Sequence, residues 1–462
     1  MSILSTVRGW IAMLFDAKAK EEFGVKPIPK TQTNAFIEEC QNIYAGLPSW
    51  ASGDIKTINF AKSVCSEVAR LTMLDTTITV DGSARADMLQ EKIDEVYKDI
   101  RRWVEYGCGN GTIVMKPNGE SIDIAKPGEF IITKTDGAKV KGCVFCNTQY
   151  ADDRYYTRLE YHRLEDGKYK ISNRCFVSDS KDTIGRPVDI DATPWVGMAE
   201  DVESDNIDRM LFGVLRMPGA NNIDTDSPYT LPIFADAVKE LEDLDVAYSR
   251  NSKEIFDSKR TILLDSDRLI PTGKKKSETD YDAAREAQGL PDIVKIVEGM
   301  GDGTMYQEIN PTLQTDTRLV GLNALLSQIG YKCGFSNGYF VFNQRTGMVT
   351  ATQVESDDRR TLQLIKDVRD QLQSCLDDLI YALDKFLDND GAPVGKYEVT
   401  YDFGDLTYNR EEDRQRWWGY VVAGAVPKWM YFNKFEGMSE DDAKKMVEEA
   451  TPKEALFPEQ EE

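Results

Sequence analysis

The residues that could carry chemistry in this sequence are few, and they lie far apart. The only histidine, His162, sits in the alternating segment YTRLEYHRL, and Cys143 and Cys146 form a CxxC pair. A zinc site would need a second pair of cysteines or histidines, and none lies nearby in the sequence. Side chains three residues apart in a strand point to opposite faces, so the pattern predicts two buried structural thiols. Without a second histidine or a nucleophile motif, His162 is a poor candidate for acid–base catalysis.

Three glycine-containing segments have some likeness to phosphate-binding loops. Such a loop follows a strand and opens a helix, whereas residues 107–111 follow a helical pattern and precede a strand pattern. We therefore expect a helix end and a turn there, and a hairpin turn at 299–303. Lys274, Lys275 and Lys276 follow a glycine that lacks the partner glycine of a Walker loop. They are either a solvated loop tip or a contact for a phosphate or a protein partner.

The catalytic motifs GxSxG and HExxH are also absent from the sequence. With no paired acid and base, no metal-ligand set and no phosphate loop, we predict no catalytic residue, no metal site and no cofactor. The protein is therefore not expected to be an enzyme.

The length, net charge and cysteine content of the chain limit the classes of protein to which it can belong. The 462 residues carry 56 Lys plus Arg against 79 Asp plus Glu, for a net charge of −23. The length corresponds to about three structural units at roughly 150 residues each. The acidity argues against a protein that clamps nucleic acid statically with a basic face. Eight scattered cysteines predict free thiols in a reducing compartment, and no apolar run approaches the roughly 18 residues of a membrane helix.

The first half of the chain has helical periodicity and then strand periodicity. An amphipathic helix is expected near residues 3–15, without a convincing signal peptide, and further helices at 34–74 and 84–106. Residues 111–177 alternate between turn signals, which predicts a β-rich block, most simply an antiparallel meander. The stretch 178–230 has the composition of loops with one strand.

The second half predicts two helices that flank a small β module. Helical spacing returns from Phe234 to about residue 257 and again at 312–333, and three short strands are expected at 261–264, 293–297 and 304–309. The longest helix is expected at 351–387, and at 1.5 Å per residue it would span about 55 Å. A strand and an acidic helical end with its own aromatic core follow, so the expected class is α+β and the expected shape elongated. That aromatic core would contain Trp417, Trp418, Tyr420, Trp429, Tyr431 and Phe432.

Two long segments resemble portal proteins of phages that infect Gram-positive bacteria, of the siphophage type. Residues 216–265 contain NNID and DSP, and residues 310–361 contain TATQV after a GFS loop. The β-rich block, with DRYYTRLEYHRL and KYKISNRCF, and the order of the elements are similar as well. The resemblance covers most of the chain.

The resemblance implies a ring of twelve subunits at one capsid vertex, in the virion, after assembly in the bacterial cytoplasm. Such a ring is the conduit for packaging, retention and ejection of double-stranded DNA. It is also the platform for the large terminase subunit and the head-completion adaptor, and it contacts the major capsid and scaffolding proteins. The fold that it implies has an α/β wing, a helical stem, a small β-containing clip, a long helix and an α-helical crown. The implied boundaries are 1–228 for the N-terminal helix and wing, 229–257 and 312–335 for the stem helices, 258–311 for the clip, 336–350 for the tunnel loop, 351–404 for the long helix and the return strand of the wing, and 405–462 for the crown.

A conduit must guide DNA without holding it, and strong phosphate contacts would slow sliding. An acidic wall lowers that friction, while a few polar or cationic residues per subunit can centre the duplex. The candidates are Asn343, Gln344 and Arg345 in the implied tunnel loop, with Arg250 and Lys253 on the first stem helix as weaker ones. An intersubunit salt bridge is the alternative for Arg345. A solvated or interface face is the alternative for the two stem residues.

The remaining expectations concern partners and competing functions. Lys274, Lys275 and Lys276 would contact a partner of the clip, and the apolar tip 339–342 would pack between subunits. A packaging-motor enzyme would need the phosphate loop that is absent. Another head–tail or adaptor component is the remaining alternative, although such chains are usually much shorter.

Overall fold

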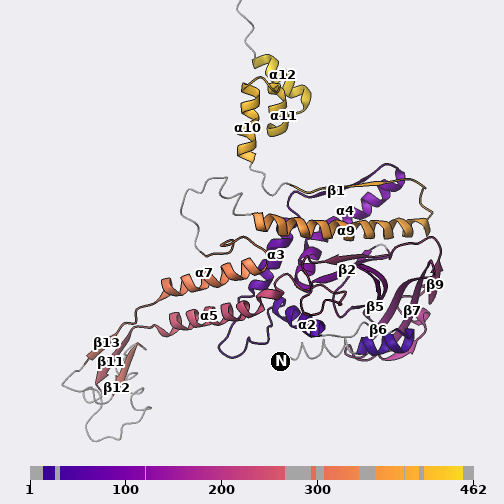
Figure 1. Ribbon diagram of the computed structural model, residues 1–462. Coiled ribbons are helices and arrows are strands. Elements are labelled where there is room, and N and C mark those ends of the chain that lie inside the picture. The colour runs from indigo at the N-terminus through magenta and orange to yellow at the C-terminus, as the bar shows by residue number, and fades with distance from the viewer. Residues whose placement is uncertain are drawn as a thin grey trace, which may run out of the picture. The chain divides into compact units, whose positions relative to one another are not determined.

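The computed structural model describes residues 14–25, 32–119, 121–265, 293–297, 306–342, 359–389, 391–404 and 410–450. The chain divides into two compact units, Met1–Tyr401 and Asp402–Glu462. Helices and sheets are both extensive, so the expected α+β class is confirmed (Figure 1). No helix among these residues combines the length and the apolar character that a membrane crossing requires.

The first unit opens with helices that cover its sheets. Residues 14–23 are helical, and α2 (Gln32–Tyr44), α3 (Phe60–Thr72) and α4 (Ala84–Asn110) follow. The prediction that residues 34–74 are helical is confirmed for α2 and α3 and was wrong for residues 45–59, which form a loop between them. Gly46 adopts a φ of 76° there, and Pro48 cannot continue a helix. The polar groups of this loop bond to another helix instead, as described below.

The β-rich block forms a six-stranded antiparallel sheet and part of a second sheet. The larger sheet has the order β4-β5-β6-β7-β8, with β9 also paired to β7. In register, Cys143 of β5 faces His162 of β6, and Phe145 faces Glu160. The meander prediction is therefore confirmed for this sheet. Its strands are β4 (Phe130–Asp136), β5 (Lys139–Ala151), β6 (Arg154–Glu165), β7 (Lys168–Ser178), β8 (Arg186–Val188) and β9 (Asp201–Ser204).

Two smaller sheets join segments that are distant in sequence. One has the order β10-β2-β3, and the other pairs β1 with β14. Helix α9, described from Arg359 to Asn389, packs against β10 and β2. This helix agrees with the prediction of a long helix, whose first residues, 351–358, lie outside the described part of the chain. The strands are β1 (Thr77–Asp81), β2 (Thr112–Asn118), β3 (Ser121–Ala125), β10 (Gly213–Arg216) and β14 (Glu398–Asp402).

The six-stranded sheet has a hydrophobic cluster on each face. One cluster joins Phe130, Phe145 and Phe212 to Ala382 of α9, and Cys143 belongs to it. The other joins Phe15 of the helix 14–23 to sheet residues, and Cys146 packs against it. The two thiols of the CxxC pair thus lie on opposite faces of β5, as the strand period predicts. All eight cysteines are free.

Close approach of the backbone explains the glycines at the end of α4. Gly111 caps the helix with a φ of 80°, and a Cβ there would lie 2.1 Å from the carbonyl oxygen of Thr230. The prediction of a helix end and turn was correct, although α4 continues through Gly107 and Gly109. A Cβ on Gly109 would lie 2.9 Å from the ring of Tyr44, so these glycines serve packing.

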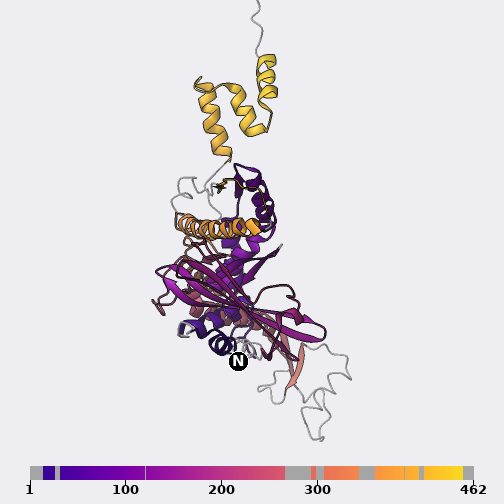
Figure 2. The ribbon, with the colours of Figure 1, turned by 90° about the vertical axis from the view of Figure 1, so that its right-hand side faces the viewer.

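The rest of the first unit contains the two helices and the small sheet expected from the sequence. Helix α5 (Val238–Asp257) and helix α7 (Thr315–Lys332) lie side by side (Figure 1). Between them in the chain come β11 (Thr261–Asp265), β12 (Val294–Val297) and β13 (Tyr306–Ile309). In the second unit, α10 (Arg410–Val422), α11 (Lys428–Glu436) and α12 (Glu440–Ala450) form a group of helices (Figure 2).

Candidate functional site

The candidate site is an arm made of α5, α7 and the sheet of β11–β13. Leu241 and Leu244 of α5 are buried, as are Leu322 and Leu326 of α7, so the helices share an apolar seam. β11 lies at the centre of the three-stranded sheet, parallel to β12 and antiparallel to β13. The helices and short strands predicted from the sequence are therefore present, and the β module lies at one end of the helix pair.

Polar contacts fasten the two helices to each other at both ends. The ammonium group of Lys332 donates to Glu240 Oε1 at 2.6 Å and to the carbonyl oxygen of Asp236 at 3.0 Å. At the end near the β module, Arg318 forms an ion pair with Glu254, which also accepts a bond from the backbone N–H of Gln314. The pair is thus held as one unit.

The loop 45–59 forms a strap that fastens α5 to the helices α2 and α3. The indole N–H of Trp50 donates to Asp245 Oδ2 at 2.9 Å, and the backbone N–H of Ile58 donates to Oδ1 at 3.0 Å. One turn further along α5, the hydroxyl of Ser249 accepts from the backbone N–H of Lys56 at 2.8 Å. Asp245 is only 3% exposed. A carboxylate at this depth is stabilised by hydrogen bonds, and here two donors of the strap supply them.

The two stem candidates for DNA contact differ in their surroundings. Lys253 lies on the strap side of α5 and forms an ion pair with Asp54 at 2.8 Å. The pair is exposed, and it raises the pKa of Lys253 through the hydrogen bond to Asp54. Arg250 is exposed on the same helix. The two side chains are three residues apart and therefore neighbours on the surface of α5, but Lys253 is paired with Asp54 of the strap, whereas Arg250 is exposed.

The tunnel-loop candidates Asn343, Gln344 and Arg345 lie outside the described residues, as do Lys274, Lys275 and Lys276. The structure does describe the residues just before and just after the segment that contains Asn343, Gln344 and Arg345. The backbone N–H of Ser336 donates to the hydroxyl of Thr361 at 2.9 Å, and both residues are buried. The segment 337–360 therefore begins and ends at one point, between α7 and α9.

The first half of the tip 339–342, which is expected to pack between subunits, has contacts within the chain. The ring of Phe340 lies 5.1 Å from that of Phe60 and 4.8 Å from that of Phe335. The hydroxyl of Tyr339 donates to Glu67 of α3. These two aromatic residues thus pack within the chain, because α3 passes beside the end of α7. Phe342 is 57% exposed.

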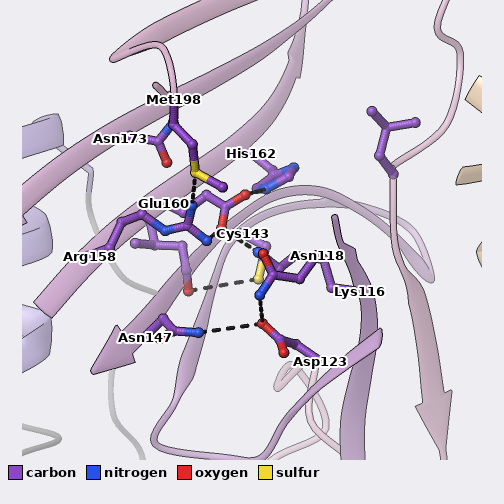
Figure 3. A network of polar contacts seen from close by, with 12 residues as sticks. Lys116, Asn118, Asp123, Cys143, Asn147, Arg158, Glu160, His162, Asn173 and Met198 are labelled. Carbon is purple, nitrogen blue, oxygen red and sulfur yellow. Dashed lines mark hydrogen bonds and ion pairs between the residues drawn. The ribbon is translucent and has the colours of Figure 1, made fainter. Parts of the chain in front are cut away.

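A second cluster of charged residues lies buried beside the six-stranded sheet (Figure 3). Glu160 Oε2 accepts from Lys116 and, at 3.1 Å, from Arg158 Nη2. Burial would raise the pKa of Glu160, but the charges of Lys116 and Arg158 hold it well below its usual value. The carboxylate therefore stays ionised in the interior of the protein.

His162 belongs to this cluster and is 1% exposed. Its Nε2 lies 2.7 Å from Glu160 Oε1, and its Nδ1 lies 2.6 Å from the hydroxyl of Tyr169. That hydroxyl also accepts the backbone N–H of Leu211 at 3.0 Å. Burial lowers the pKa of His162, although Glu160 partly offsets this. The ring is thus neutral, with its proton on Nε2, and it links the sheet to the segment before β10.

No group of three or more His, Cys, Asp or Glu residues in the described ranges could hold a metal ion. Sequence reasoning missed the partners of Glu160, because Lys116 comes from another strand. The one available signal was the run Arg158, Glu160 and His162 at alternate positions, which places three polar side chains on one face of β6.

Comparison with known proteins adds no family to this description. The chain matches no protein-family model and no curated protein.

Proposed function

We propose that this chain is a subunit of a portal-type ring, a conduit through which double-stranded DNA enters and leaves a capsid. The observation that carries the proposal is the arm, in which two packed helices flank a small β module in the order helix, sheet, helix. Ser336, after α7, and Thr361, in the first turn of the described part of the long helix α9, then meet through a hydrogen bond. The sequence resemblance described above has the same order of elements.

In this proposal different segments of the chain contact the DNA and the partner proteins. Residues 343–345 contact the DNA that passes through the ring, and the loop that contains Lys274, Lys275 and Lys276 contacts the terminase and later the adaptor. Twelve copies form the ring, which the major capsid and scaffolding proteins surround. The net charge of −23 suits such a conduit, because a mostly acidic surface weakens phosphate contacts and lets DNA slide. The sequence has no phosphate-binding loop, so a partner supplies the energy for movement.

The test is the particle that the purified full-length chain forms. Mass photometry should give a particle of about twelve chain masses, the number that the sequence resemblance implies, because heterologous contacts whose rotation closes generate a ring. Negative-stain images should show a ring with a central hole and a projecting stalk. A monomer under all conditions, including mixtures with the terminase and scaffolding proteins of its own phage, would contradict the proposal. Compact particles without a hole would favour another head–tail component.

A further inference from the structure

The buried guanidinium of Arg158 has more N–H donors than acceptors around it. Arg158 is 2% exposed, and its Nη2 donates to Glu160 Oε2 at 3.1 Å. That carboxylate also accepts from Lys116 and from His162. A guanidinium carries five N–H donors, and here Nε has no partner in the described part of the chain. Since a buried donor without an acceptor costs stability, an added acceptor at this place would stabilise the fold.

The other contact of the guanidinium is with a sulfur atom. Nη1 of Arg158 donates to Sδ of Met198 at 2.6 Å (Figure 3). The ring of Trp195 lies 5.3 Å from the same guanidinium, and Nδ2 of Asn173 donates to the carbonyl oxygen of Ala199 at 2.9 Å. The segment 195–200 therefore covers Arg158. The atom that it offers to Nη1 is a thioether, which is only a weak acceptor.

This covering segment faces solvent on its other side. Val196 is 68% exposed and Met198 is 38% exposed, and all of residues 196–200 are exposed. Met198 thus joins a buried cation to the surface of the protein. A small oxidant in solution can reach such a side chain, and the side chain can shift outward to make room for an added atom.

Oxidation would turn this sulfur into the acceptor that Arg158 lacks. A peroxide transfers one oxygen atom to the thioether: an S–O bond forms and the O–O bond breaks. Sulfur loses two electrons, and with hydrogen peroxide the product that leaves is water. In an apolar core the polar sulfoxide is disruptive. Beside a guanidinium its oxygen accepts a charge-assisted hydrogen bond, which is stronger than a neutral one.

We propose that Met198 is a modification site, where oxidation by a peroxide fastens the segment 195–200 to the sheet through Arg158. The sulfoxide oxygen accepts from Nε or Nη1, and the sign of the effect is opposite to that of oxidation in a core. Methionine sulfoxide reductases reverse the reaction, so the fastening is reversible. The inference goes beyond the proposed conduit and does not rest on it.

The test uses partial oxidation of the full-length chain by hydrogen peroxide. The sample is held in urea near the unfolding midpoint, and a short pulse of protease removes the unfolded molecules. Peptide mass spectrometry then compares the surviving chains with the starting sample. Met198 sulfoxide should be enriched several-fold among the survivors. Met88 of α4 is the matched control at 37% exposed, and its sulfoxide should not be enriched.

Two results of this experiment would overturn the inference. One is equal survival of chains oxidised at Met198 and at Met88, or a loss of the chains oxidised at Met198. The other is a Met198 that stays unoxidised under conditions that oxidise Met88, because the side chain would then not be a modification site.

Variants at the same position test the acceptor without the oxidant. Met198→Gln places a carbonyl oxygen near the position of the sulfoxide oxygen, and it should lower the equilibrium constant of unfolding by about tenfold, since hydrogen bonds to charged groups are among the stronger ones. Met198→Leu keeps the apolar volume without an acceptor and should not stabilise, and peroxide should not stabilise it either. Met88→Gln is the matched control and should have no such effect. Equal stability of the two variants at Met198 would contradict the proposed bond.

Discussion

His162 has an environment that favours the neutral ring, because burial lowers its pKa. Glu160 accepts from Nε2, and the hydroxyl of Tyr169 already accepts the backbone N–H of Leu211. With the proton of that hydroxyl directed at Nδ1, the neutral ring has a partner at each nitrogen. Protonation would also place a further cation beside Lys116 and Arg158 in the interior of the protein. The folded structure therefore stabilises the neutral form of His162.

Stability should therefore fall as the pH drops through the range where an unfolded histidine titrates. The pKa of His162 is lowered by folding, so its contribution is complete above the unfolded value of about 6.5 and is lost below it, by up to about 1.4 kcal/mol per pH unit. Urea unfolding at pH 7.5, 6.5 and 5.5 measures this.

His162→Gln is the control for that experiment. Because the chain has a single histidine, this variant removes the only such side chain that titrates in the window. Glu160 contributes at lower pH, since its pKa is held well below the usual value of a glutamate. The variant should be less stable at pH 7.5 but should lose less stability on acidification. An unchanged pH slope would show that His162 does not stay neutral in the fold.

The strap shows how an element of structure depends on one polar side chain. Periodicity alone predicts that residues 45–59 continue a helix, since Ile55 and Ile58 extend the apolar stripe of α3. The chain leaves the helix because Gly46 and Pro48 interrupt it and because Asp245 of α5 offers two acceptor oxygens. The orientation of the arm thus depends on contacts between segments nearly two hundred residues apart.

Asp245→Ala should destabilise the protein by about 2 kcal/mol, because it leaves the indole N–H of Trp50 and the N–H of Ile58 without their acceptor in a partly buried place. Asp243→Ala, on the exposed side of α5, should change stability by less than about 0.5 kcal/mol. Chemical denaturation of both variants measures the difference. Hydrogen exchange should localise the loss to residues 45–59 and to α5, and equal stability of the two variants would refute the role of the strap.

Across the whole molecule, the net charge of −23 is accounted for by the proposed conduit, because an acidic surface weakens phosphate contacts with sliding DNA. Arg345→Ala removes one cation per subunit from the proposed tunnel loop, and it should spare ring assembly while reducing DNA packaging by about tenfold, since the contacts repeat around the ring. Complementation of a portal-deficient phage, scored by the DNA content of heads, measures this.

Lys253→Ala removes a cation at another place in the same arm and is the matched control. Its ammonium group is paired with Asp54 within the chain, so packaging should stay close to that of the wild type. Normal packaging by Arg345→Ala would remove that residue from the proposed conduit. A loss of rings in either variant would assign it to assembly instead.

The sequence by itself determined the elements and the absence of catalytic motifs. The strand period separated Cys143 from Cys146, and the helical spacing predicted α5, α7 and α9, because these patterns depend on neighbours along the chain. Only the tertiary structure decided which polar groups from distant segments contact each other. Lys116 reaches Glu160 from a second sheet, Trp50 reaches Asp245 across the strap, and Tyr339 turns inward to Glu67. Such contacts are fixed by packing between distant segments, so no local pattern contains them.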